Sequence, residues 1–136
     1  MGFTATEKIL MNHSIEHIDG ISPGDFINAY VDYAGIHESE FSRPYRIFEE
    51  LGEWKGVFNP NKIGLFLSHH NCTAHSDELA EYQKHAREWA AKLGFKVYDL
   101  GTGIAHIQIM ERGLVYPGAL AIFGDSHSTA YGAAGD

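Results

Sequence analysis

Cysteine, positive charge and long apolar runs are all scarce in this sequence. The 136 residues include 1 cysteine, which excludes an internal disulfide and fits a reducing compartment, so we expect a cytoplasmic protein. No run approaches the roughly 18 apolar residues of a membrane-spanning helix, and we expect neither a signal peptide nor a membrane partner. Lys and Arg number 10 against 18 Asp and Glu, a net charge of −8, which argues against nucleic acid as a partner.

Short apolar runs alternate with helix-like segments along most of the chain, whose length suits one domain. The run 62–68, KIGLFLS, is typical of a strand buried on both faces. Residues 76–93 place apolar side chains on one helical face, between a Ser76 cap and Gly94. Further strands are expected at 26–36, 95–101 and 119–125, and further helices from Thr4, at 45–52 and at 104–113, with a loop at 37–44. This order predicts an α/β fold, a mainly parallel sheet in a three-layer α/β/α arrangement.

Three polar turns follow the predicted parallel strands, and each contains histidine. They hold His69 and His70, then His106, then Asp125, Ser126 and His127. Ligands of open parallel sheets bind outside the carboxyl ends of the strands, so we expect these side chains to meet at one edge. Because an imidazole held by a carboxylate exchanges protons near neutral pH, that edge is predicted to be an acid–base site.

The stretch SHHNCTAH at 68–75 leaves a different interpretation open. His69, His70, Cys72 and His75 are zinc-type ligands, so the chain could instead be a small non-enzymatic metal-binding module. The spacing disfavours it, because adjacent residues of an extended segment point to opposite faces. A Ser-His-Asp hydrolase is also disfavoured, since GDSHS is not a nucleophile elbow and its Ser directly adjoins its His.

Four motifs together resemble one enzyme family. TATEKIL at 4–10, GIAH at 103–106, ERGLVYPG at 111–118 and GDSHSTAYGAAG at 124–135 occur in the order and spacing of the aconitase family of iron–sulfur hydro-lyases. Within that family the chain is similar to the large subunit of 3-isopropylmalate dehydratase, an enzyme of leucine biosynthesis. The resemblance runs from Thr4 to the last residue.

The resemblance implies reversible dehydration of a hydroxy di- or tricarboxylic acid such as isopropylmalate, with a [4Fe–4S] cluster as Lewis acid. His70 matches a histidine near the departing hydroxyl, and His106 matches one that pairs with Asp125. Asp125, Ser126 and His127 match the active-site turn that orients the substrate and the iron-bound water. These roles suit residues that supply protons while a metal stabilises the developing hydroxide.

The sequence departs from the family pattern at two places that face the substrate. His69 stands where the family usually has Asp, and an imidazole does not raise the pKa of a neighbouring imidazole as a carboxylate does. HESEFSRP at 37–44 replaces a shorter His/Asn-Asp-x-Thr-x-Pro loop, and its Arg43 is a candidate cation for the substrate. We expect His69, Ser126 and Arg43 to bind the substrate, and the departures at His69 and in the segment 37–44 to influence which hydroxy acid is accepted.

The cluster ligands of the family have no counterpart in this sequence. The three family cysteines lie beyond position 136, and Cys72 is not in a cluster motif. The resemblance therefore implies that residues 1–136 are the N-terminal part of an aconitase-type catalytic domain. We expect this part to be inactive alone and to work with the remainder of a large subunit and with a small subunit.

Overall fold

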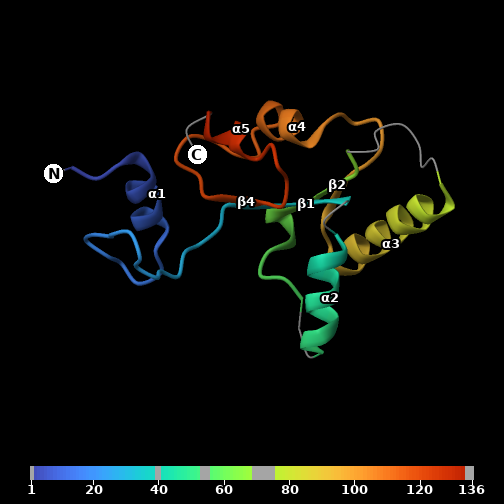
Figure 1. Cartoon of the computed structure of the whole chain (residues 1–136), viewed down its shortest axis with the longest axis horizontal. Coiled ribbons are helices and arrows are strands. Elements are labelled where there is room, and N and C mark those ends of the chain that lie inside the picture. The colour runs from blue at the N-terminus through green and yellow to red at the C-terminus, as the bar shows by residue number, and fades with distance from the viewer. Residues whose placement is uncertain (1, 39–40, 53–55, 69–75, 134–136) are drawn as a thin grey trace.

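Four parallel strands form the centre of the structure (Figure 1), a computed structural model that describes residues 2–38, 41–52, 56–68 and 76–133. The strands are β1 (Tyr33–His37), β2 (Ile63–Phe66), β3 (Lys96–Tyr98) and β4 (Ala121–Phe123), in the spatial order β3-β2-β1-β4. The helices are α1 (Ala5–His13), α2 (Ser42–Leu51), α3 (Asp77–Leu93), α4 (Ala105–Glu111) and α5 (Thr129–Gly132), and the 3-10 turn η2 (Pro60–Lys62) precedes β2. Among the described helices, none is long and apolar enough to cross a membrane.

The two faces of the sheet carry separate hydrophobic cores, because successive residues of β2 point to opposite sides. Phe66 belongs to the core that α4 and α5 cover. Leu65, Leu67 and Trp89 belong to the other core, which α2 and α3 cover. Figure 1 shows the same division, with α4 and α5 above the sheet and α2 and α3 below it. The predicted parallel α/β fold with helices on both faces is confirmed.

The helix ends lie close to where the local sequence places them. Thr4 and Glu7 form a capping box on α1, in which Thr4 Oγ1 accepts the Glu7 N–H at 3.2 Å and Glu7 Oε2 accepts the Thr4 N–H at 2.7 Å. Ser76 Oγ accepts the Leu79 N–H at 3.2 Å at the start of α3, and Gly94 ends that helix in a left-handed conformation. These bonds pair backbone groups that a helix cannot satisfy internally.

The strand expected at 26–36 is shorter in the structure and lies later. β1 begins at Tyr33, and Ala29 forms an isolated bridge to Ser14. β1 starts there because its neighbours start there: β4 begins opposite Tyr33 and β2 begins opposite Ala34. The segment 37–44 is also not wholly a loop, because His37 ends β1 and α2 begins at Ser42.

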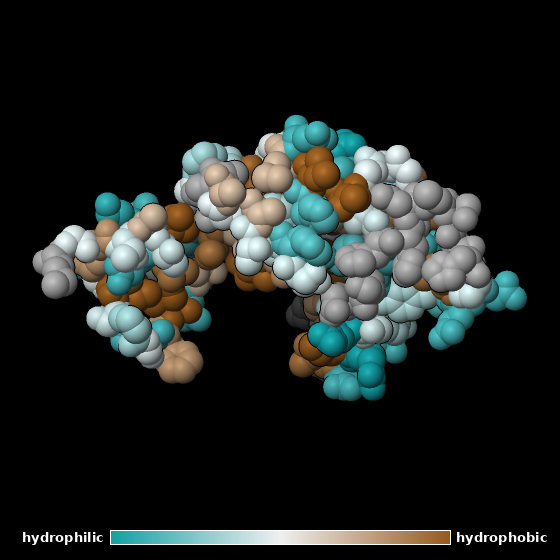
Figure 2. Space-filling model, turned by 45° about the horizontal axis from the view of Figure 1, so that its top comes forward, coloured by the Kyte–Doolittle hydropathy of each residue, from teal (hydrophilic) through white to brown (hydrophobic). Residues whose placement is uncertain are grey.

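The N-terminal segment buries little apolar surface of its own. α1 has no buried residue, and the side chains of Phe3, Ile15 and Phe26 are 42%, 52% and 102% exposed. Their region forms the left part of Figure 2, where brown, apolar surface is gathered. Hydrophobic burial therefore contributes little to the attachment of α1 to the sheet, and polar contacts contribute more to that attachment.

The polar attachment of α1 is centred on Asp32, which directly precedes β1. His13 Nε2 lies 2.6 Å from Asp32 Oδ2, and His13 Nδ1 lies 2.7 Å from the Ile9 carbonyl oxygen. Asp32 Oδ2 also accepts the Leu120 N–H at 3.1 Å, and Lys62 Nζ lies 3.6 Å from Oδ1. Burial disfavours both charged groups, yet these hydrogen bonds outweigh it: the pKa of His13 is raised and that of Asp32 is lowered.

Replacing His13 by Ala should lower the free energy of unfolding by about 1–2 kcal/mol, and the loss should depend on pH. The raised pKa of His13 adds stability that is full below its ordinary value of 6.5 and disappears as pH rises through the folded-state value. The lowered pKa of Asp32 adds stability that is full above 3.8 and disappears as pH falls through its folded-state value. Urea denaturation should therefore show the largest loss of unfolding free energy between pH 3.8 and pH 6.5.

The control for this experiment is His85→Ala, because the His85 side chain on α3 is 64% exposed. That variant should remain close to the wild-type stability from pH 4 to pH 8, as surface substitutions usually do. The same pH profile in both variants would contradict a special contribution from His13.

Gly35 in the middle of β1 allows β4 to approach closely. A Cβ at this position would overlap the ring of Phe123, which stacks on Tyr33 with 5.9 Å between ring centroids. Gly35→Ala should therefore displace that ring and lower the free energy of unfolding by about 1–3 kcal/mol, measured by chemical denaturation. Gly132→Ala is the matched control, since nothing lies within 4 Å of its Cβ position. Equal effects of the two substitutions would refute this explanation.

Candidate active site

The direction in which strands are added reverses between β1 and β4. The chain adds β2 and then β3 on one side of β1, and it then returns to add β4 on the other side. Such a reversal leaves a crevice outside the carboxyl ends of the two strands, where ligands of α/β proteins bind. His37 ends β1, and Asp125 and His127 closely follow β4. Ionisable side chains therefore collect at the place where a ligand site is expected.

The turn after β4 is fixed by hydrogen bonds to Asp125. Its Oδ2 accepts the His127 N–H at 2.7 Å, and its carbonyl oxygen accepts the N–H and the hydroxyl of Ser128 at 3.2 and 2.7 Å. Ser126 Oγ lies 3.1 Å from His127 Nδ1. The side chain of Asp125 is 4% exposed, whereas that of His127 is 67% exposed. The turn thus holds a carboxylate in place and presents an imidazole to solvent.

His106 reaches this turn from α4, where it is the second residue. The chain enters α4 through Gly101 and Gly103, whose φ angles of 78° and 114° favour glycine. The buried side chain of Gln108 donates from Nε2 to the Gly103 carbonyl oxygen at 2.5 Å and to Thr102 Oγ1 at 3.1 Å. These bonds hold the turn that presents His106.

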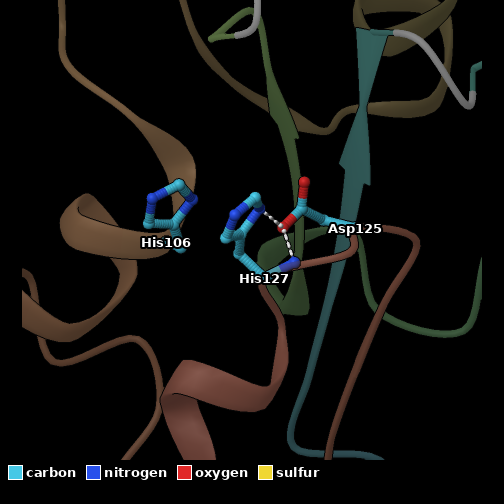
Figure 3. Close-up of side chains that lie close together, drawn as sticks. All are labelled: His106, Asp125 and His127. Atoms are coloured by element: carbon cyan, nitrogen blue, oxygen red, sulfur yellow. Dashed lines mark hydrogen bonds and ion pairs between the residues drawn. The ribbon is translucent and has the colours of Figure 1, made fainter.

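His106, Asp125 and His127 form one cluster (Figure 3). The two imidazole rings are stacked, with 4.9 Å between their centroids and 24° between their planes. His127 Nδ1 lies 3.9 Å from Asp125 Oδ2, and each of the three residues offers a ligand-type atom within 4.8 Å of the others. Imidazole and carboxylate groups in such an arrangement are of the kind that transfer protons to and from a bound substrate. The same nitrogen and oxygen atoms are donors for a divalent metal ion.

A second polar cluster at this edge of the sheet is buried. His37 Nε2 lies 3.0 Å from Ser68 Oγ, and His37 Nδ1 lies 3.2 Å from Glu38 Oε2. Glu38 Oε2 also accepts the Ser68 N–H at 2.8 Å, and all three residues are at most 5% exposed. His37 and Glu38 are not among the candidate residues predicted from the sequence, because the segment 37–44 is expected there to be a loop. Their position directly after an apolar run, at a strand end, is the signal that could have found them.

Ser126 and Arg43 are the other described residues of the predicted site. Ser126 lies beside His127, with which its hydroxyl is in contact. Arg43 lies in the first turn of α2 and is exposed. α2 covers the sheet face opposite to α4, and the role of Arg43 as a cation for the substrate stays a prediction.

The remaining predicted residues fall in the stretch 69–75, outside the described residues. They are His69 and His70 of the predicted acid–base site, and Cys72 and His75 of the metal-binding alternative. The expectations for these four residues therefore stay predictions. Ser68, the last described residue before them, belongs to the buried cluster with His37 and Glu38.

These features define a parallel α/β protein with two imidazoles and a carboxylate close together at the switch point of its sheet. A sequence model of the aconitase family (aconitate hydratase) matches residues 62–136, which is more than half of the chain. The chain belongs to the aconitase family. The family resemblance predicted from the sequence motifs is thus confirmed.

Several relatives are similar over nearly the whole chain. The 3-isopropylmalate dehydratase large subunit of Aquifex aeolicus is 40% identical, and the large subunit 1 of the same name from Pyrococcus abyssi is 37% identical. The homoaconitase large subunit of Thermus thermophilus is 33% identical. The alignments cover 99% of this chain but 31% of each relative. The chain therefore spans about a third of the length of these large subunits.

Glu38→Gln should destabilise the fold, because it replaces one carboxyl oxygen of a buried, hydrogen-bonded cluster by an amide NH₂ group. The side chain keeps its size, but the acceptor for the Ser68 N–H and the partner of His37 change. An unsatisfied buried polar group costs about 1–3 kcal/mol, so the urea midpoint should fall. Glu50→Gln on the exposed side of α2 is the control and should have little effect. A similar midpoint in both variants would contradict a structural role for Glu38.

Proposed function

We propose that this chain forms part of the active site of a hydro-lyase that acts on a hydroxy di- or tricarboxylic acid such as isopropylmalate. The observation that carries the proposal is the cluster of His106, Asp125 and His127 at the switch point, within an aconitase-family chain. The named relatives include 3-isopropylmalate dehydratase and homoaconitase large subunits, whose shared substrate chemistry is that of hydroxy acids.

The chemistry of such a reaction suits the cluster. In dehydration a C–H proton is removed, the C–O bond breaks, a C=C bond forms, and the departing hydroxide takes up a proton to leave as water. His127 is exposed enough to meet a substrate, and Asp125 is held so that it can orient that imidazole. His106 stacks on His127 and supplies a second imidazole at the same place. We assign proton transfer to the imidazoles and orientation to Asp125 and Ser126.

The iron–sulfur cluster that the family resemblance implies does not fit the donors of this chain. The sequence has 1 cysteine, whereas a family cluster takes three thiolates from the protein. We therefore assign the cluster, and the polarisation of the substrate hydroxyl that it would supply, to residues outside positions 1–136. The partners proposed for this chain are the remainder of a large subunit and a small subunit, and the proposed location is the cytoplasm.

The choice of hydroxy acid depends on residues that differ from the family pattern. His69 and the longer segment 37–44 replace family residues near the substrate. Glu38 and His37 of that segment form a buried cluster rather than an exposed loop. We propose that this segment shapes the substrate site of the enzyme. Arg43, in the first turn of α2, is the candidate cation of this segment for the substrate.

The proposal can be tested with a chimera in which residues 1–136 replace the matching part of the Aquifex aeolicus large subunit, assayed with its small subunit. The chimera should hydrate or dehydrate isopropylmalate or a related hydroxy acid, and His127→Asn should lower kcat at least about 100-fold, because general acid–base groups contribute that much. His85→Ala should leave kcat unchanged. The isolated 136-residue chain should show no turnover after anaerobic iron–sulfide treatment.

Two outcomes would contradict the proposal. A chimera that folds and carries its cluster, yet turns over none of the hydroxy acids, would exclude this chain from the active site. Equal kcat values for the His127→Asn and wild-type chimeras would exclude proton transfer by this histidine. Far-ultraviolet circular dichroism and the visible absorbance of the cluster distinguish both outcomes from misfolding.

A further inference from the structure

We propose that His106, Asp125 and His127 together bind a single divalent transition-metal ion of the Zn²⁺ type. The three side chains supply two imidazole nitrogens and one carboxylate oxygen, and their ligand-type atoms lie within 4.8 Å of one another. Two imidazoles with one carboxylate is a donor set that Zn²⁺ and Fe²⁺ accept, with further positions left open for water. The site needs no thiolate and so is independent of the iron–sulfur centre considered above.

The geometry requires only small side-chain movements. Ligand atoms in a tetrahedral zinc site lie about 3.3 Å apart, since Zn–N bonds are about 2.0–2.1 Å long. The present atoms are at most 4.8 Å apart, and the rings are stacked at 24° rather than pointing at a common centre. His127 has room to turn, because its side chain is 67% exposed. Rotation of this ring toward Asp125 brings the third donor into range.

The less mobile donors are already held in place. Asp125 is 4% exposed, and its Oδ2 accepts the His127 N–H at 2.7 Å, which fixes the carboxylate relative to the turn. His106 is placed by the turn that Gln108 braces. Preorganised donors of this kind reduce the entropy that binding an ion would otherwise lose. Two fixed ligands and one adjustable ligand make a site that can close around an ion.

The ion would bind the same imidazole nitrogens of His106 and His127 to which we assign proton transfer. A lone pair that coordinates a metal cannot accept a proton, so an occupied site would hold both imidazoles out of acid–base exchange. The metal site therefore acts as an inhibitory site for the proposed hydro-lyase. Metal binding itself does not depend on that function, because it requires only these three side chains.

Titration of the 136-residue chain with Zn²⁺ and with Co²⁺ tests the proposal without any turnover. Calorimetry should give one ion per chain, and Co²⁺ should show ligand-field bands without the sulfur-to-cobalt charge transfer that a Cys ligand would produce. His106→Ala, Asp125→Asn and His127→Ala should each weaken binding at least about 100-fold. His85→Ala should bind like the wild type, since that exposed histidine on α3 lies outside the cluster.

A second pair of variants separates this site from the histidine-rich stretch 69–75. Cys72→Ser and His75→Ala should leave the affinity unchanged if the ion binds the cluster. Loss of binding in these two variants, with retention in His106→Ala, would overturn the proposal in favour of the metal-binding module. Absence of binding by the folded wild-type chain would overturn it as well. Circular dichroism of each variant identifies any loss that comes from unfolding.

Discussion

The handedness of strand connections determines where the candidate site lies. Parallel strands are joined by right-handed crossovers, so a chain that reverses its direction across the sheet must place the next helix on the opposite face. The step from β3 to β4 makes this reversal, and α4 accordingly covers the face opposite to α2 and α3. The crossover carries His106 over the sheet to the turn that holds His127. β3 and β4 are the outer strands of the described sheet. Even so, His106, which follows β3, stacks on His127, which follows β4.

The buried cluster beside this crevice adds a constraint of a different kind. His37, Glu38 and Ser68 join the ends of β1 and β2 through hydrogen bonds in surroundings with almost no access to water. Groups of this kind are costly to bury singly, and their mutual bonds compensate that cost. The cluster therefore holds two strand ends in a fixed relation, close to where the chain enters the stretch 69–75. This cluster is buried, whereas the His127 side chain at the same edge of the sheet is exposed.

Local sequence patterns predicted the features that depend on interactions between residues close in the sequence. The Thr4 and Ser76 caps, the Gly94 terminator and the buried run that became β2 were all correct, because each depends on neighbouring residues alone. The start of β1 was not, since it depends on where β2 and β4 begin. The strand ends and the family resemblance predict that His106 lies near Asp125 and His127, but not that the two imidazole rings stack, because the sequence does not reveal on which side of β1 the last strand is added.

Histidine density along a sequence and donor density in space are different properties. Residues 68–75 hold three histidines and the cysteine, but closeness along the chain does not by itself bring donor atoms together. The donors that do converge among the described residues come from α4 and from the turn after β4, which the fold brings together. The proposed acid–base role and the proposed metal site therefore compete, because a proton and a divalent ion bind the same imidazole lone pairs. If both proposals hold, an ion bound at this cluster would remove the two rings from proton transfer.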